Sequence, residues 1–234
     1  MQAPLILACD TTQAACSVAL YRNGLMAQKL SLMTKGHAEA LIPMMEALLA
    51  EADAPITAID RLAVTHGPGT FTGTRVGLSA MRGLALALKK PLKAYGGLHV
   101  MALGAAKGLP VLVAVDARRS VFYVQSFDAA HHPLSEPQAL SAEMALALMA
   151  DDEFALMGSG AGQLAELAAE KGLNCHAAEA PDWPEARHVA GLAAADGEWT
   201  DPPLPSPFYL RPPDATLPNR DKFPARVGHG ADDG

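Results

Sequence analysis

Several features that mark common protein classes are scarce or missing in this 234-residue sequence. Only three residues are cysteines, an odd number without metal-ligand spacing, so neither a disulfide framework nor a structural metal site is expected. Charged residues make up only 18% of the chain, a low share that a membrane protein could also have. However, no apolar run approaches the length of a membrane helix, about 20 residues. The first residues have no basic segment and reach Asp10 too soon for a secretory signal, so the chain is predicted to be cytoplasmic.

The sequence is nevertheless typical of a globular protein. Half of its residues are apolar, and the chain is long enough for one large domain or two small ones with substantial cores. Its net charge of −7 repels a phosphate backbone, so nucleic acid would be contacted mainly through another subunit.

The first part of the chain predicts three antiparallel strands, two long helices and two further strands. Apolar runs on either side of a polar turn, followed by Asn23-Gly24, favour a strand, a turn and a hairpin. The apolar spacing then becomes helical. The expected strands are 5–9, 16–21, a third reaching residue 32, 61–65 and 92–95; the expected helices are 37–53 and 71–90, and a short helical stretch ends near residue 107.

The same order of elements then starts again. An apolar strand that ends in an aspartate, 111–116, matches 5–10, and the strand 154–157 runs into a glycine loop and a helix. Hairpins give antiparallel pairs and helical crossovers give parallel pairs, so the duplication predicts two α/β lobes with mixed sheets. We expect lobes at 1–106 and 110–200. The proline-rich tail, 201–234, should have a disordered end, and its role is open.

Aspartates and glycine loops at strand ends suggest a nucleotide site between the lobes. Backbone N–H groups at such turns and at helix N-termini favour phosphate. The alternative is that the aspartates only form turns and the glycines only serve backbone geometry. The first loop, 67–73, matches neither the Walker pattern nor the GxGxxG fingerprint. The candidate residues are Asp10, Thr11, Thr12, Gly67, Gly69, Gly73, Asp116, Gly158 and Gly160.

Patterns of catalytic and metal-ligating residues are absent from the sequence. The residue four positions after His37 is Leu41, so no histidine pair exists on that helix. There is no HExxH motif and no GxSxG elbow, and the cysteines lack a nucleophile motif. We therefore predict no catalytic residue and no metal ligand.

The two long helices have broad apolar arcs, wider than the roughly 100° needed to cover one side of a core. One face of each helix should cover a sheet and the other should meet an exchangeable protein partner, unless the second lobe covers both. We expect Met45→Asp or Met81→Asp to break that pairing and leave the fold intact. The predicted interface residues are His37, Leu41, Met44, Met45, Leu48, Arg75, Val76, Ala80, Met81 and Leu84.

Five segments resemble the TsaB family, the dimerization subunits of the bacterial machinery that installs threonylcarbamoyl on a tRNA adenosine. The most specific is the run from His66 to Gly77, HGPGTFTGTRVG. The other segments are Asp10-Thr11-Thr12, Lys35 to Glu39, Asp116 to Arg119, and Phe208 to Arg211.

This resemblance implies an actin-like ATPase (ASKHA, RNase H-like) fold with two similar lobes. It implies homodimers when alone, pairing with the catalytic paralogue TsaD through the N-lobe helices, a third ATPase subunit TsaE, and contact with tRNA through the complex. The paralogue carries a His-x-x-x-His metal pair on its first long helix. At the matching positions this chain has His37 and Leu41, so the second metal ligand is missing, which fits a subunit that is not an enzyme by itself.

The resemblance implies a vestigial nucleotide site and no cofactor of the chain's own, with ATP or ADP possible at the subunit junction. The alternative is an active ATP-dependent phosphotransferase of the same superfamily, based on Asp10, Asp116 and the two glycine loops. A third function, peptidase activity, is supported by no nucleophile or metal motif.

Overall fold

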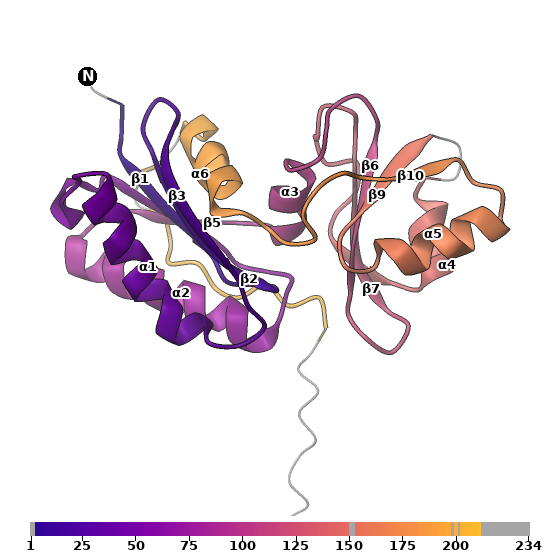
Figure 1. Cartoon of the computed structure of the whole chain (residues 1–234), viewed down its shortest axis with the longest axis horizontal. Coiled ribbons are helices and arrows are strands. Elements are labelled where there is room, and N and C mark those ends of the chain that lie inside the picture. Colours follow the sequence, from indigo (N-terminus) through magenta and orange to yellow (C-terminus); the bar gives the residue numbers. More distant parts are fainter. Residues whose placement is uncertain (1–2, 150–152, 198, 201, 212–234) are drawn as a thin grey trace, which may run out of the picture.

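The computed structural model describes residues 3–149, 153–197, 199–200 and 202–211. They form two lobes side by side, each built on a five-stranded mixed sheet (Figure 1). The disorder expected at the end of the tail concerns residues outside this described part. Among the described residues, no helix is both long and apolar enough to cross a membrane.

The first sheet has the strand order β3-β2-β1-β4-β5. The central strand β1 is antiparallel to β2 and parallel to β4, as the hairpin and the helical crossover predict. The strands are β1 (Ile6–Asp10), β2 (Ala15–Tyr21), β3 (Leu25–Leu32), β4 (Arg61–Thr65) and β5 (Leu92–Tyr95), with a 3-10 turn η1 (Ile56–Ala58) before β4.

Side chains that alternate along β1 divide the first lobe into two cores. Leu7 and Cys9 face the two long helices, α1 (His37–Glu51) and α2 (Phe71–Leu88), which cover one side of the sheet (Figure 1). Ile6 and Ala8 face α6 (Ala186–Ala195) on the other side. Alanines on both the sheet and α6 allow the helix to lie close to the strands.

The second lobe repeats the topology of the first, with the strand order β10-β9-β6-β7-β8. Strand β6 is antiparallel to β7 and parallel to β9, as β1 is to β2 and β4. Its elements are β6 (Val111–Asp116), β7 (Phe122–Phe127), β8 (Gln138–Leu140), α4 (Ala142–Ala147), β9 (Phe154–Met157), α5 (Ala161–Glu170) and β10 (Cys175–Ala177). The predicted duplication into two similar α/β lobes is confirmed.

Two helices pack on the sheet of the other lobe, relative to the expected lobes 1–106 and 110–200. Helix α3 (Gly97–Ala102) belongs to the first range but packs on β6 and β7 of the second sheet. Helix α6 belongs to the second range but packs on β1 and β2 of the first sheet. Each sheet therefore receives its second helical layer from the other half of the sequence.

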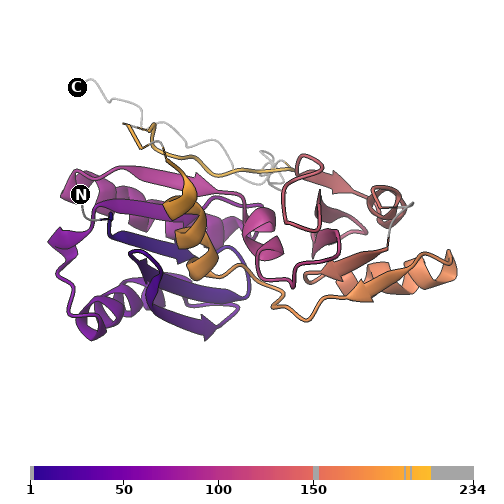
Figure 2. The same cartoon turned by 90° about the horizontal axis from the view of Figure 1, so that it is seen from above.

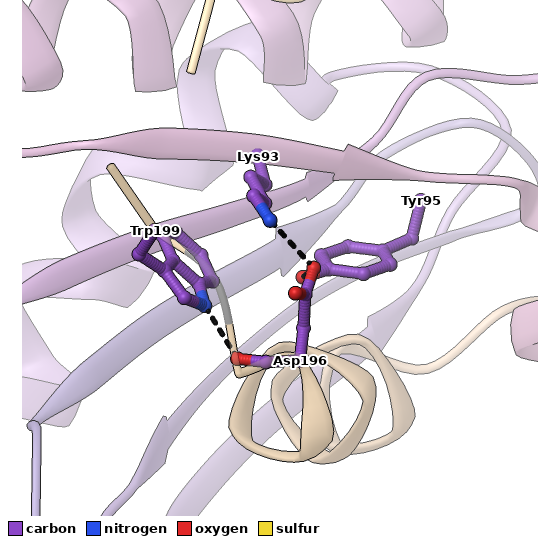
Figure 3. A network of polar contacts seen from close by, with 4 residues as sticks. All are labelled: Lys93, Tyr95, Asp196 and Trp199. Carbon is purple, nitrogen blue, oxygen red and sulfur yellow. Dashed lines mark hydrogen bonds and ion pairs between the residues drawn. The ribbon is translucent and has the colours of Figure 1, made fainter. Parts of the chain in front are cut away.

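A polar network fixes the end of α6 against the first sheet. The Asp196 carboxylate accepts hydrogen bonds from the Lys93 ammonium (2.9 Å) and the Tyr95 hydroxyl (3.3 Å), both on β5. The Trp199 indole N–H donates to the Asp196 carbonyl oxygen (3.0 Å) (Figure 3). These contacts hold the returning chain to the edge strand of the first lobe and so set the course of the segment that follows.

Candidate functional site

The first predicted nucleotide turn lies where β1 ends, and its side chains are buried. The Asp10 carboxylate accepts hydrogen bonds from the Thr12 N–H (3.2 Å), the Thr12 hydroxyl (2.8 Å) and the Thr65 hydroxyl. Thr65 ends β4, which runs parallel to β1, so the two strand ends meet at one edge of the sheet. Both carboxylate oxygens therefore have donors within the protein.

Burial also changes the acidity of this carboxyl group. Asp10 has no exposed surface, and desolvation raises its pKa to about 6, although the hydrogen bonds from Thr65 and Thr12 oppose that rise. Asp10 is therefore a structural group that holds two strand ends together, with no free lone pair directed to solvent.

The glycine loop, residues 67–73, closes over this turn by backbone contact. The Thr70 N–H donates to the Thr12 carbonyl oxygen (2.8 Å). A Cβ atom at Gly69 would overlap that same carbonyl, so only glycine allows the approach. The loop and the turn are therefore in direct backbone contact at Thr12.

Thr11 joins the turn to the first turns of α2. Its hydroxyl donates to the Gly73 carbonyl oxygen (2.7 Å) and accepts from the Gly77 N–H (3.0 Å). A Cβ atom at Gly73 would overlap the Thr11 carbonyl oxygen, and one at Gly77 would lie 2.7 Å from the Thr11 hydroxyl oxygen. The GxxxG spacing therefore permits α2 to pack directly against the turn.

Met101 of α3 fills the space between the first turn and the second glycine loop. The Gln13 side-chain amide donates to the Met101 sulfur (3.5 Å), and the Met101 Cε lies 3.2 Å from where a Cβ at Gly158 would stand. Met101 is itself 1% exposed. Asp10 is thus bonded internally, and the Met101 thioether lies between the first turn and the second glycine loop.

The equivalent turn of the second lobe is open. Asp116 is exposed, its N–H donates to the Ser159 hydroxyl (3.1 Å), and its carboxylate accepts from the Arg118 N–H (2.7 Å). A Cβ at Gly158 would overlap the Ala114 carbonyl oxygen, and Gly160 packs as closely on the Phe122 ring. These glycines therefore serve close packing, and the two aspartates occupy different environments despite their equivalent positions.

Half of the predicted interface residues lie inside the chain's own structure. His37 is 8% exposed, and its ring nitrogen is 2.9 Å from the Gln13 carbonyl oxygen, which ties the start of α1 to the β1–β2 turn. The following five predicted interface residues are buried in this chain: His37, Leu41, Met45, Leu48 and Met81. Since Met45 and Met81 are core residues, an aspartate at either position would disrupt the fold itself.

The other predicted interface residues lie on or near the outer surface. Arg75 is exposed, and the rest are half-buried: Met44, Val76, Ala80 and Leu84. A groove of about 420 Å³ lies between the N-terminal halves of α1 and α2. We call it the docking groove; its lining residues are Ala38, Leu41, Ile42, Phe71, Thr72, Arg75, Val76, Ser79 and Ala80.

Two prominent apolar residues of the docking groove were not in the predicted set. Ile42 is 42% exposed and Phe71 is 48% exposed. Ile42 is part of the apolar arc of α1, so the sequence contained a signal for it. Phe71 is the first residue of α2, where helical periodicity has not yet begun and supplies no signal.

The sequence prediction also concerns metal-ligating side chains and cysteine thiols. Among them, no group of three His, Cys, Asp or Glu side chains could hold a metal ion. Burial raises the pKa of Cys9 and raises that of Cys16 to about 11, so neither thiol ionises readily.

Comparisons with known proteins give a consistent result. A family model described as "TsaD: tRNA N6-adenosine threonylcarbamoyltransferase" matches residues 31–192. The tRNA threonylcarbamoyladenosine biosynthesis protein TsaB of Escherichia coli is 38% identical over 121 residues, which are 50% of this chain and 52% of that protein. An uncharacterized protein of Mycobacterium tuberculosis is 31% identical over 219 residues, 92% of this chain and 95% of the relative.

The solved structures agree with the sequence relatives. A Pseudomonas aeruginosa protein, described as uncharacterized with similarity to the peptidase YEAZ, has a TM-score of 0.76 at 30% identity. That match covers 89% of this chain and 100% of the other. The chain spans about half the length of the first curated relatives that it matches.

The fold and the site together define a two-lobed α/β protein with two similar mixed sheets, in which the Asp10 side chain is bonded internally and the N-lobe helices keep an apolar groove. The structural agreement confirms the fold that the resemblance implied. The chain belongs to the family of the matched model and is a TsaB-like protein.

Proposed function

We propose that this chain is the non-catalytic dimerization and activating subunit of the machinery that makes tRNA N6-threonylcarbamoyladenosine. In this role it pairs with the catalytic subunit TsaD, is joined by the ATPase TsaE, and reaches tRNA through the complex in the cytoplasm. Alone, it forms a homodimer. The names of the TsaB relatives and the matched family model support this proposal.

The observation that most supports pairing is the docking groove. Ile42 and Phe71 place large apolar surfaces in contact with water beside the half-buried Val76. Full burial of such side chains contributes about 1.5–3 kcal/mol each, so several together can offset part of an association cost of about 4–15 kcal/mol. Because this gain offsets only part of the association cost, we expect an exchangeable pair and not a permanent one.

The closed Asp10 turn supports a vestigial nucleotide site in this chain. In the proposed complex, ATP or ADP binds at the junction of subunits, with residues from a partner. We expect calorimetry of the isolated chain with Mg-ATP to give no binding heat. Tight binding with turnover that is lost in Asp10→Asn would support the phosphotransferase alternative instead.

The pairing is tested by light scattering after size exclusion, for the chain alone and mixed with a TsaD protein. We expect Ile42→Asp to yield monomers, because a carboxylate in the docking groove must be desolvated on pairing. Met144→Asp is the matched control, since Met144 is 58% exposed on α4 of the second lobe. A wild-type chain that stays monomeric and never binds TsaD would refute the proposal.

A further inference from the structure

Three exposed side chains form a stacked cluster at the rim of the docking groove. The Arg75 guanidinium carbon lies 3.2 Å from the centroid of the Phe71 ring and 5.5 Å from that of the Tyr209 ring. The two rings stack on each other with centroids 5.9 Å apart. Arg75 thus has aromatic neighbours from its own helix and from a segment that follows more than a hundred residues later.

The C-terminal segment, residues 205–211, is fixed independently of this cluster. The Phe208 N–H donates to the His66 carbonyl oxygen (2.8 Å), and the Phe208 and His66 rings stack at 5.5 Å. Gly67 has a φ of 109° and packs directly on the backbone of Phe208, where a Cβ atom would lie only 2.7 Å from the Phe208 carbonyl oxygen. Figure 2 shows this segment running along the first lobe toward the second, where Arg211 donates to the Ala117 carbonyl oxygen (3.5 Å). Tyr209 is therefore held in place by its neighbours.

The two groove helices have opposite charges. Helix α1 contains three glutamates and no lysine or arginine, whereas α2 contains two arginines and no acidic residue. All three glutamates of α1 are exposed; Glu51 pairs with Lys29, so Glu39 and Glu46 are the carboxylates that we consider for a contact with another copy. Within the part of the chain that the structure describes, Arg75 makes no ion pair. When two copies meet about a two-fold axis, the acidic helix of each can face the basic helix of the other.

We propose that Tyr209 is a positioning residue for association: with Phe71 it holds the Arg75 guanidinium at the groove rim, where Arg75 binds a carboxylate of α1 in a second copy of this chain. This inference rests on the proposed function, because it assumes that the groove is a pairing surface. A guanidinium held on aromatic rings keeps its N–H edge free for a bidentate contact with Glu39 or Glu46 of that copy. The C-terminal segment is in this way part of the pairing surface.

Sedimentation velocity of four proteins tests the role of Tyr209: the wild type, Tyr209→Ala, Arg75→Gln and the double variant. We expect Tyr209→Ala to weaken self-association about five- to tenfold. The double variant should be no weaker than Arg75→Gln, because both changes remove the same contact. Tyr209→Phe should retain wild-type association, since it keeps the ring. Leu204→Ala is the matched control from the same part of the chain, 41% exposed and outside the groove.

The salt dependence and an NMR measurement complete the test. Self-association of the wild type should weaken as the salt concentration rises, because salt screens the contact between Arg75 and the carboxylate. Arg75→Gln and Tyr209→Ala should both show a smaller decrease. If the wild type associates but Tyr209→Ala behaves like Leu204→Ala, or adds fully to Arg75→Gln, this inference is overturned while the proposed pairing stands.

A wild-type chain that remains monomeric refutes the pairing, and the positioning is then decided by the Arg75 side-chain N–H resonance. Because the Phe71 ring stays near Arg75 in Tyr209→Ala, a changed ring-current shift in this variant supports the positioning, and an unchanged resonance overturns it.

Discussion

Replacing Asp10 by asparagine should change how the stability of this protein depends on pH. The buried carboxyl has a pKa of about 6 in the folded chain against 3.8 in the unfolded chain. Between these values the folded state holds a proton that the unfolded state has lost, so folding stability falls as pH rises from about 4 to about 6 and is level above. A difference of about two pKa units corresponds to about 3 kcal/mol.

Urea unfolding followed by circular dichroism at several pH values measures this effect. Asp10→Asn has no carboxyl to titrate, so its stability relative to the wild type should increase by about 2–2.5 kcal/mol between pH 4 and pH 7, most of the full difference. Any constant cost of the amide in the Thr12 and Thr65 hydrogen bonds cancels in that comparison. A stability difference that is the same at every pH would mean that the carboxyl is solvated and the turn is open.

Four further substitutions test the packing and the polar contacts of Asp196. Gly73→Ala should destabilise the chain by about 1–3 kcal/mol or more, because its Cβ overlaps the Thr11 carbonyl; wild-type stability in urea would contradict that contact. Met81→Ala should lower the free energy of unfolding by about 2–5 kcal/mol, because Met81 lies in the core. Ile42→Ala should change the stability of the monomer by less than about 0.5 kcal/mol, because Ile42 lies on the outer face. Equal losses for the two variants would refute this assignment of inner and outer faces. Asp196→Ala should speed proteolysis near residue 199, since it removes the two carboxylate contacts, with Lys93 and Tyr95, that hold the end of α6 to β5, and unchanged cleavage would count against this.

The strand and helix pattern of this protein can largely be predicted from sequence. Apolar runs that end in Asp10 and Asp116 predict β1 and β6, and the spacing after Gly36 predicts α1. Helix α6 is harder to predict, because its core side chains are mostly alanines that pack on alanines of the first sheet. Its small apolar residues give only a weak sequence signal, and nothing local indicates that it returns to the first lobe.

The site was predicted less well, for a physical reason. A broad apolar arc does not fix how a helix is rotated about its axis, so Met45 and Met81 could not be distinguished from Ile42 as core or surface residues. The contact between Phe71 and Tyr209 joins residues far apart in the chain, and only the folded structure brings them together.

Amide hydrogen exchange at rising protein concentration tests the central claim most directly. If α1 and α2 present a pairing surface, the amides of residues 38–46 and 71–80 should become more protected as the concentration of the chain increases, while those of the second lobe should not. Protection that is independent of concentration in both helices, with the chain monomeric throughout, would contradict the claim.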